Sequence, residues 1–396
     1  MRIVFVIPYF YDAWAYGGQP RSAYEMARGL VARGHTVEVL TTDSGGPHRL
    51  SIPGDGLHRV VDGITVRHYR NLSNTLAFRY RMFLPFVFFR DVAKRVRGAD
   101  VVHIHELRSF LSVSAAAASR RQSIPFVLSP HGGLRHLGRR GLKALFDRLW
   151  GRRILRTAAA VIAISPVEEQ DATAMKVSAK RIFRVPNSVP GVSRDSMPHE
   201  GMFRQQYRLP PGPIALFLGR LHSVKGADLL VEAFARMCRE TGDAETHLVL
   251  AGPDDGQGQQ LRRMVERLEI RDRVTFTGYL DQIQKLRAFV DSRLVVIPSR
   301  SEVFALTALE SLICSRPVLL SSACGLFPNP GEENGVRSFD ESSIEDLRTQ
   351  LQRALNDPGL LERAGNGRSF AAREFSAETV AIKLEIVYRT IGQAHG

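Results

Sequence analysis

The sequence predicts an α/β protein made of two Rossmann-like domains, each built on a parallel β-sheet. The chain has 396 residues, a length for which two domains are the natural expectation. Apolar runs of strand length alternate with segments of helical periodicity, which is the pattern of βαβ units. This rhythm is interrupted by a polar stretch containing Pro and Gly that runs to Pro213, and then it starts again. We therefore place the domain boundary near residue 188.

The first half of the chain begins with a buried strand and a glycine-containing loop. The loop ends in Gly17-Gly18, and a helix is predicted over Ser22–Arg33, where Gly34 stops it. The compact G-x-G-x-x-G of a dinucleotide site is absent, so the glycine pair is either a ligand loop or a flexible turn. Further strands are predicted at Arg2–Ile7, Thr36–Thr41, Asp100–Glu106, Phe126–Ser129, Val161–Ser165 and Ile182–Pro186.

Histidines follow two of these strands. His103 and His105 alternate onto one face at the end of a strand, and His131 stands between Pro130 and Gly132 after the next strand. The carboxyl ends of parallel strands are where open α/β sheets bind ligands. A metal site is a weak interpretation, because no third ligand is suitably spaced. A turn histidine without a ligand remains the plain alternative for His131.

The second half repeats the βαβ pattern. Helices are predicted over Ala227–Arg239 and Val303–Ile313. Strands are predicted at Ile214–Leu218, His247–Ala251, Val274–Gly278, Leu294–Ile297 and Val318–Leu320.

Two carboxylates mark the unit between the last two of these strands. Glu302 lies in the turn and Glu310 lies eight residues later in the predicted helix, about 12 Å along its axis. A carboxylate can accept hydrogen bonds from two neighbouring hydroxyls, and a helix N-terminus attracts phosphate. The pair therefore suits the two ends of a nucleotide-sugar, although both could simply be solvated helix charges.

These residues resemble a known family. P-S-x-x-E-x-F-x-L-x-x-L-E-x-x-x-x-x-x-P-V, which starts at Pro298, looks like the E-x7-E region of retaining glycosyltransferases of the GT4 type, whose fold is GT-B. The motifs G-R-L-x-x-x-K-G, starting at Gly219, and S-P-H-G, starting at Ser129, are similar to that family as well. The chain departs from the usual glycines at Ala305 and Ser315.

The resemblance implies an arrangement and a set of site residues. Two domains face each other across a cleft, and the helix over 376–396 crosses back to the domain of residues 1–188, which leaves 189–375 as the second domain. The catalytic residues would be His131, Glu302, Arg220 and Lys225. The donor-binding residues would be Gly17, Gly18, Arg220, Lys225, Tyr279, Glu302, Val303, Phe304, Ala305, Leu306 and Glu310, and the acceptor would meet His105 and Glu106.

The expected reaction is transfer of a hexose from a nucleotide-sugar, UDP-sugar first and GDP-sugar second, to a saccharide or lipid-linked saccharide. Cations such as Arg220 and Lys225 would stabilise the departing diphosphate more as its charge grows. We expect no cofactor and no metal, because no Asp-x-Asp occurs. A nucleotide-sugar epimerase and a non-catalytic GT-B-like scaffold remain alternatives, and the motifs leave the base, sugar, acceptor and linkage open.

Charge is concentrated in the first half. The net charge is +14, and residues 1–188 hold 29 Lys and Arg against 13 Asp and Glu, whereas residues 189–396 hold 25 against 27. Aromatic and basic residues interleave over Phe78–Arg97, and Leu134–Arg156 reads as a basic amphipathic segment. This composition favours contact of the two segments with an anionic membrane surface over packing of a basic helix on its own domain. No nucleic-acid motif appears.

The expected location is the cytoplasm, with peripheral attachment to the inner face of the membrane. The three cysteines form neither a metal spacing nor a disulfide framework, which fits a reducing compartment. The apolar N-terminus is interrupted by Pro8 and Asp12, so a buried strand explains it better than a signal peptide.

Overall fold

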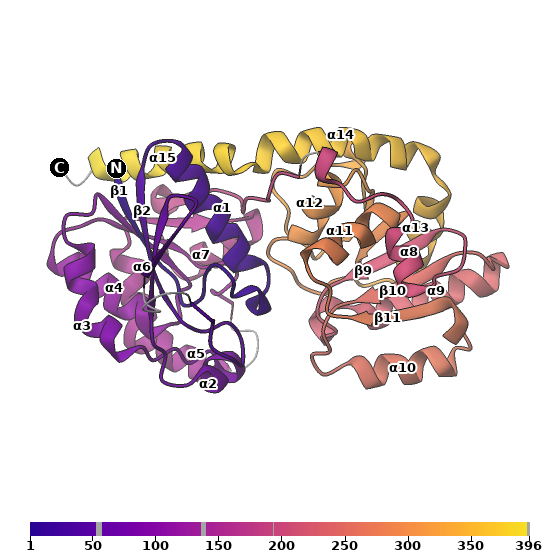
Figure 1. Cartoon of the computed structure of the whole chain (residues 1–396), viewed down its shortest axis with the longest axis horizontal. Coiled ribbons are helices and arrows are strands. Elements are labelled where there is room, and N and C mark those ends of the chain that lie inside the picture. The colour runs from indigo at the N-terminus through magenta and orange to yellow at the C-terminus, as the bar shows by residue number, and fades with distance from the viewer. Residues whose placement is uncertain (53–57, 136–139, 193, 394–396) are drawn as a thin grey trace. The chain divides into compact units, whose positions relative to one another are not determined.

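The chain folds into two compact units. The computed structural model describes residues 1–52, 58–135, 140–192 and 194–393. The N-terminal unit comprises Met1–Pro190 and Phe375–Gly396, and the C-terminal unit comprises Gly191–Glu374 (Figure 1). The division falls close to residue 188, where the change in composition suggested it.

The N-terminal unit is built on an eight-stranded sheet with the order β3-β4-β2-β1-β5-β6-β7-β8. Every neighbouring pair is parallel except β3 with β4, which are antiparallel. The strands are β1 (Arg2–Val6), β2 (Thr36–Thr42), β3 (His58–Val61), β4 (Ile64–Tyr69), β5 (Val101–His105), β6 (Phe126–Ser129), β7 (Ala160–Ala163) and β8 (Ile182–Arg184). All predicted strands of this half are confirmed, whereas the edge hairpin β3–β4 was not predicted.

Eight α-helices of the described residues belong to this unit. They are α1 (Gly18–Ala32), α2 (Asn74–Tyr80), α3 (Phe86–Val96), α4 (Phe110–Arg121), α5 (Arg140–Phe146), α6 (Arg152–Thr157), α7 (Pro166–Ala174) and α15 (Ala377–Gln393). The predicted helix over Ser22–Arg33 begins four residues earlier, at Gly18. The predicted basic segment Leu134–Arg156 lies partly outside the described residues. Its described part is α5 and α6, joined by a π-helical segment at Asp147–Gly151.

The C-terminal helix α15 packs on the N-terminal unit, beside α1 (Figure 1). A side chain at Gly29 of α1 would come within 2.2 Å of the backbone oxygen of Ala377, so the glycine permits this close contact. Val380, Leu384 and Tyr388 of α15 are buried against the sheet. The end of the chain is thereby part of the same hydrophobic core as its beginning.

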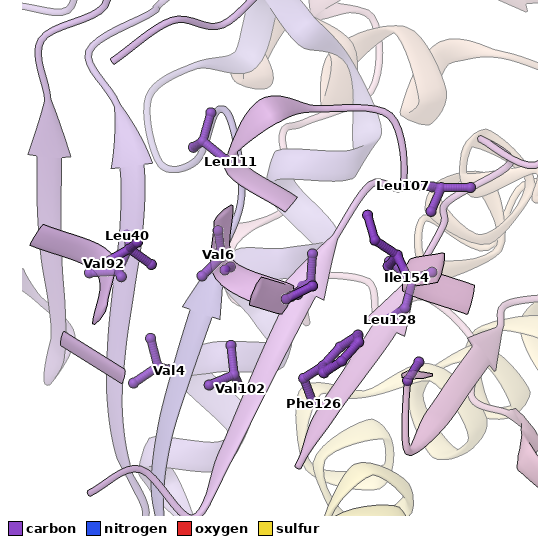
Figure 2. Close-up of a cluster of buried hydrophobic side chains, with 14 of the residues drawn as sticks. Val4, Val6, Leu40, Val92, Val102, Leu107, Leu111, Phe126, Leu128 and Ile154 are labelled. Atoms are coloured by element: carbon purple, nitrogen blue, oxygen red, sulfur yellow. The ribbon is translucent and has the colours of Figure 1, made fainter. Parts of the chain in front are cut away.

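The core of the N-terminal unit lies on both faces of the sheet. On one face Val4, Val6, Val102, Phe126 and Leu128 pack against the helices that cover them, as Figure 2 shows. Because both faces of the sheet are covered at its centre, β1, β6 and β7 are largely apolar along their length, and this is why they could be predicted.

The C-terminal unit has a six-stranded parallel sheet with the order β11-β10-β9-β12-β13-β14. Its strands are β9 (Ile214–Leu218), β10 (His247–Ala251), β11 (Val274–Gly278), β12 (Leu294–Ile297), β13 (Val318–Ser321) and β14 (Val336–Phe339). Its helices are α8 (Met202–Tyr207), α9 (Ala227–Thr241), α10 (Gly258–Arg267), α11 (Gln282–Asp291), α12 (Leu306–Ile313), α13 (Ile344–Asn356) and α14 (Pro358–Phe375). The order reverses at β9 and β12, whose carboxyl ends therefore form the switch point at which such sheets bind ligands.

Candidate functional site

The turn between β12 and α12 is longer than predicted. The helix begins at Leu306 rather than Val303, with Ala305 as its N-cap. Glu302 instead makes an extended bridge with Cys324, and its N–H donates to the backbone oxygen of Ala323. The N–H of Ala305 likewise donates to Gly325, so the backbone here pairs with the segment after β13 before the helix can start. The predicted extent of this helix was wrong by three residues.

Lys225 and Glu302 meet at the carboxyl ends of β9 and β12. Lys225 ends a short 3-10 turn, Ser223–Lys225, and its Nζ lies 2.7 Å from Oε1 of Glu302. The other carboxylate oxygen of Glu302 accepts a hydrogen bond of 2.8 Å from Ser299. Both side chains are largely covered, with 25 % of the Lys225 side chain and 16 % of the Glu302 side chain exposed. A fixed cation and a fixed carboxylate thus share one corner of the sheet.

Gly226 makes this corner possible. It adopts a left-handed conformation with φ 68°, and a Cβ there would lie 1.9 Å from the backbone oxygen of Pro298. Only glycine lets the turn after β9 approach the end of β12 so closely.

Glu310 also forms an ion pair with a lysine. The Nζ of Lys285 in α11 lies 2.5 Å from Oε1 of Glu310, and the two side chains are 11 % and 15 % exposed. Two glutamates eight residues apart are therefore each held by a lysine, and an ordinary pair of solvated helix charges would not show this burial. The sequence analysis missed Lys285, because nothing in the spacing of α11 links it to α12.

Arg220 and Tyr279 are more exposed. The Arg220 guanidinium forms an ion pair with Asp255, and 55 % of its side chain is accessible. Tyr279 follows β11 and is 59 % exposed. The structure thus brings Lys225 together with Glu302, whereas Arg220 turns to a carboxylate of the loop after β10.

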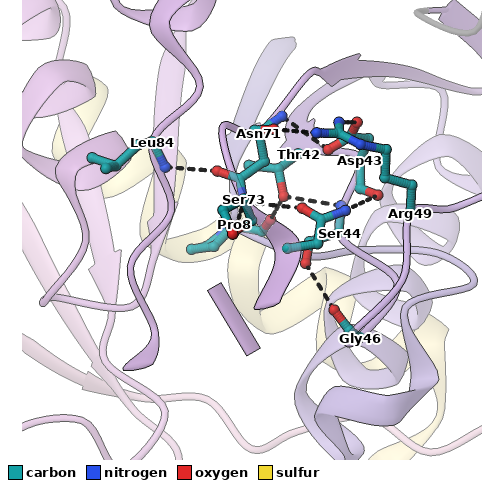
Figure 3. A network of polar contacts seen from close by, with 10 residues as sticks. Pro8, Thr42, Asp43, Ser44, Gly46, Arg49, Asn71, Ser73 and Leu84 are labelled. Carbon is teal, nitrogen blue, oxygen red and sulfur yellow. Dashed lines mark hydrogen bonds and ion pairs between the residues drawn. The ribbon is translucent and has the colours of Figure 1, made fainter. Parts of the chain in front are cut away.

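Gly17 and Gly18 lie where the loop after β1 enters α1. Gly17 is the N-cap, with φ 96°, and Gly18 is the first residue of the helix. The preceding Tyr16 donates or accepts a hydrogen bond of 2.6 Å with Ser44. Ser44 belongs to a polar network in which Asp43 binds the N–H of Asn71 and pairs with Arg49 (Figure 3). The glycine loop is therefore anchored by polar contacts rather than free.

His131 and His105 form one hydrogen-bonded pair. Nε2 of His131 lies 2.8 Å from Nδ1 of His105, and the ring planes are nearly parallel. His105 is fully buried, so it reaches the site edge only through His131. Burial lowers the pKa of His131 to about 4, against a smaller opposing contribution from the Asn187 side chain. The backbone of His131 is left-handed, with φ 50°, a strained conformation of the kind found at ligand sites.

Glu106 lies at the end of β5 with φ 71° and binds the hydroxyl of Tyr9. The Tyr9 hydroxyl also lies 2.7 Å from Oε1 of Gln19. Burial raises the pKa of the Glu106 carboxyl, and the charge of Arg81 partly opposes this shift. Sequence spacing did not reveal Tyr9 and Gln19, since Tyr9 lies on the loop after β1, Gln19 lies in the first turn of α1, and both reach Glu106 only in the fold.

Family models match both units of the chain. The model described as "Glycosyl transferase 4-like domain" matches residues 17–188, and the model described as "Glycosyl transferases group 1" matches residues 202–368. The first match contains His131 and the pair Gly17 and Gly18, and the second contains Lys225, Glu302 and Glu310.

Curated relatives and solved structures agree with these matches. The chain is 28 % identical over 319 residues to an alpha-D-kanosaminyltransferase of Streptomyces kanamyceticus, covering 76 % of this chain and 80 % of that protein. It is 26 % identical over 396 residues to a D-inositol 3-phosphate glycosyltransferase of Jonesia denitrificans, covering 94 % and 91 %.

Two solved structures share the fold over nearly the whole length. A sucrose-phosphate synthase from Thermosynechococcus elongatus has a TM-score of 0.73 and 23 % identity, covering 100 % of both chains. Anabaena HepE, solved in complex with UDP and glucose, has a TM-score of 0.72 and 17 % identity, covering 98 % of this chain and 100 % of that chain. The fold is that of the GT-B enzymes.

Proposed function

Because this chain belongs to the group 1 glycosyl transferases, we propose that it moves a hexose from a nucleotide-sugar to a saccharide or lipid-linked saccharide, with retention at the anomeric carbon. A UDP-sugar is the favoured donor and a GDP-sugar the second choice. Synthesis of a cell-surface polysaccharide or glycolipid is the proposed setting.

One observation supports this proposal above the others. Glu302 and Glu310 lie on one βαβ unit, and each is covered and held by a lysine. Carboxylates in this state are fixed acceptors for hydroxyl pairs, and a nucleotide-sugar offers such pairs on the sugar and on the ribose. Lys225 lies between the ends of β9 and β12, where a diphosphate would be drawn by its charge and by the start of α12.

The proposed roles follow from this geometry. Glu302 positions the transferred sugar, Glu310 the ribose, and Lys225 the diphosphate, whose negative charge grows as the bond to the sugar breaks. A cation fixed before the reaction stabilises that growing charge without reorganising. In the free chain Lys225 and Glu302 neutralise each other, so donor binding would redistribute their hydrogen bonds.

We propose that the reaction needs no metal ion, with Lys225 and Arg220 supplying the positive charge. Among the described residues, no group of three or more His, Cys, Asp or Glu side chains is arranged to hold a metal. His103, His105 and His131 use their ring nitrogens to contact each other and neighbouring hydroxyls rather than converging on one point.

We also propose that the N-terminal unit rests on an anionic membrane surface in the cytoplasm. The apolar side chains Leu142, Leu145 and Leu149 are 53–68 % exposed, whereas Ile154 and Leu155 further along the same segment are buried in the core of the unit. Phe86 and Val87 at the start of α3 are about as exposed. Arginine and lysine residues lie between them, which suits lipid headgroups. In the described parts of the chain, no helix is long and apolar enough to cross a bilayer.

The experiment that tests the proposed function has two stages. A thermal-shift screen of UDP-, GDP- and ADP-sugars should identify a donor that stabilises the protein. Release of the nucleoside diphosphate from that donor should then depend on added saccharide acceptor and should fall sharply in Lys225→Ala. Product formation from the nucleotide-sugar alone, or no stabilisation by any donor, would contradict the proposal.

A further inference from the structure

The loop after β6 contains two successive residues in the left-handed conformation. His131 has φ 50° and Gly132 has φ 77°, and the N–H of Gly133 donates to the backbone oxygen of Pro130. Glycine adopts this conformation freely, whereas histidine is strained in it. Such strain persists only where the surrounding structure holds the backbone in place. The contacts that hold this loop therefore also set the position of His131, a predicted catalytic residue.

Glu168 in the first turn of α7 contacts this loop. Its Oε1 accepts a hydrogen bond of 2.5 Å from the N–H of Gly132, and its Oε2 accepts one of 3.0 Å from the N–H of Ile164. Glu168 is 0 % exposed. One buried carboxylate thus joins the chain just after β7 to the loop that follows β6, the neighbouring strand of the sheet.

The sequence around Glu168 allows a simpler interpretation, which the contacts do not support. The residues S-P-V-E, starting at Ser165, have the form of a capping box, in which the glutamate would accept from the N–H of the N-cap serine. Ser165 is indeed the N-cap, and its side chain accepts from the N–H of Glu168. The carboxylate of Glu168, however, binds Ile164, which precedes the cap, and Gly132, which lies in another loop. Glu168 therefore joins two segments rather than capping its own helix.

A carboxylate at this depth is unfavourable unless its contacts compensate for the lost water. Burial raises the pKa of Glu168 to about 7, and the N–H groups of Ile164 and Gly132 oppose this shift. Asp171 raises the pKa and Arg135 lowers it, and these two residues form an ion pair with each other. An apolar side chain would avoid the desolvation cost but would leave the two N–H groups without this acceptor. The need to bind these donors therefore explains a glutamate here better than packing does.

The contact acts at the peptide bond next to the histidine. Arg108, which precedes α4, donates to two backbone oxygens further along the loop. Glu168 instead binds the N–H of the peptide that joins His131 to Gly132. The orientation of that peptide plane sets ψ of His131, so this hydrogen bond determines the backbone conformation from which the imidazole projects.

We propose that Glu168 is a positioning residue for sugar transfer, whose carboxylate binds the N–H of Gly132 and thereby holds His131 in the conformation that presents its ring to the transferred sugar. The catalytic consequence rests on the proposed function, whereas the hydrogen bond does not.

The hydrogen bond can be measured in the full chain without any activity. Carbon-13 labelling of the histidine carbonyls combined with nitrogen-15 labelling of glycine selects the dipeptide His-Gly, which occurs at residues 131–132 and 395–396. A short hydrogen bond to a carboxylate moves an amide proton downfield. The Gly132 amide should therefore resonate downfield of ordinary glycine amides in the wild type, and it should move upfield in Glu168→Gln.

Three variants separate positioning from folding. Glu168→Gln keeps the shape of the side chain but offers one acceptor oxygen to two donors. Glu168→Asp keeps the charge on a shorter side chain. Glu385→Gln is the matched control, because Glu385 on α15 is a covered carboxylate of the same unit, 7 % exposed, and is paired with Arg33 at 2.7 Å.

The kinetic expectation distinguishes a positioning role from a purely structural one. The turnover number should fall at least about tenfold in Glu168→Gln, while the donor KM changes little. Glu168→Asp should retain more turnover than Glu168→Gln, because it still offers a charged acceptor. Glu385→Gln should keep the turnover of the wild type, even where its melting temperature falls as far as that of Glu168→Gln.

The outcomes that would overturn the inference differ from a failure of the proposed function. A Gly132 amide that does not move in Glu168→Gln would refute the hydrogen bond, and a moved amide with unchanged turnover would refute the positioning role. Should Glu168→Gln not fold, Glu168→Asp decides both points by the same two measurements. If the wild type transfers no sugar from any donor, the proposed function fails, and an upfield move of the Gly132 amide would still support the hydrogen bond.

Discussion

At the scale of single residues, the site depends on charges that are fixed in advance. Lys225 and Lys285 each hold one glutamate of the β12–α12 unit, and all four side chains are largely covered. Ion pairs of this kind contribute modestly to stability, but breaking one leaves a covered charge without a partner. We therefore expect single substitutions of these four residues to affect function more than substitutions in the exposed ion pairs elsewhere in the unit.

Lys225→Ala is the sharpest test at this scale. Removing the cation should lower the turnover number about a hundredfold or more, because the charge acts where negative charge develops. Steady-state kinetics with the donor found by screening would measure this. Arg236→Ala is the control, since Arg236 forms an i,i+4 pair with Glu232 on the surface of α9. Unchanged turnover in Lys225→Ala, with a melting temperature like that of the wild type, would refute the role in the departure of the diphosphate.

At the scale of elements, the parallel strands were the predictable part of the fold. β6, β9, β10, β11 and β12 begin and end at the predicted residues. β6, β9, β10 and β12 are buried and largely apolar along their length, so their limits can be predicted from the sequence, whereas β11 is a partly exposed edge strand. β3, β4 and β14 were not predicted. β3 is a short, half-exposed edge strand in which polar residues are tolerated.

The candidate site was predictable only in part. The motifs identified Lys225, Glu302, Glu310 and His131 as residues of interest, and the fold brings Lys225 to Glu302. Their partners Lys285, Tyr9 and Gln19 come from other elements, and no spacing along the chain indicates such contacts. The start of α12 was wrong because backbone pairing of Glu302 with Cys324 is a tertiary interaction.

Ser315 offers a prediction about α12. It follows the C-cap of the helix with φ 55°, a left-handed conformation that favours glycine. Ser315→Gly should raise the free energy of unfolding by about 1 kcal/mol, because it removes this strain. Urea unfolding followed by circular dichroism would measure the change.

The reverse substitution is available as a control at another helix end. Gly242 is the left-handed C-cap of α9, and an added Cβ there would meet no atom within 4 Å. Gly242→Ser should therefore destabilise the protein by about 1 kcal/mol through backbone strain alone. A destabilised Ser315→Gly would show that the serine side chain makes a contribution larger than the strain.

At the scale of the whole molecule, the two units differ in charge and in their buried groups. Among the described residues, the N-terminal unit contains the buried histidines His68, His103 and His105 and the half-buried His131, whereas the C-terminal unit contains one buried histidine, His247. The N-terminal unit also carries the exposed apolar and basic residues of α3 and of Leu142, Leu145 and Leu149. The two halves should therefore respond differently to pH and to lipid.

The stability of the N-terminal unit should fall as the pH falls. Burial lowers the pKa of His103 to about 3 and of His68 and His131 to about 4, below the value of about 6.5 in an unfolded chain. Between pH 6.5 and 4 the unfolded state therefore binds more protons, and each group removes up to about 1.4 kcal/mol of stability per pH unit. Glu168 opposes this, because burial raises its pKa to about 7.

Both tryptophans, Trp14 and Trp150, lie in the N-terminal unit, so their fluorescence reports its unfolding. Urea titrations at pH 7, 6 and 5 should give a steadily smaller free energy of unfolding. A value at pH 5 equal to or above that at pH 7 would show that the buried carboxyls outweigh the histidines.

Membrane attachment should depend on the exposed leucines and on salt. The wild type should sediment with vesicles containing anionic lipid and should dissociate as ionic strength rises. Leu142→Ser combined with Leu145→Ser should weaken this binding. Ile386→Ser, which changes an exposed apolar residue on α15, should not. Binding that is absent, or that is insensitive to salt, would contradict the proposal.

The most direct test of the account is calorimetric titration of the favoured nucleotide-sugar into the wild type, Glu310→Gln and Glu345→Gln. Glu310 is proposed to hold the ribose, whereas Glu345 pairs with Arg348 on α13. The account predicts that the wild type and Glu345→Gln bind the donor equally well and that Glu310→Gln binds it at least about tenfold more weakly, since a hydrogen bond to a charged group contributes about 1.5–3 kcal/mol. Equal binding by all three proteins, or no binding of any nucleotide-sugar by the wild type, would contradict it.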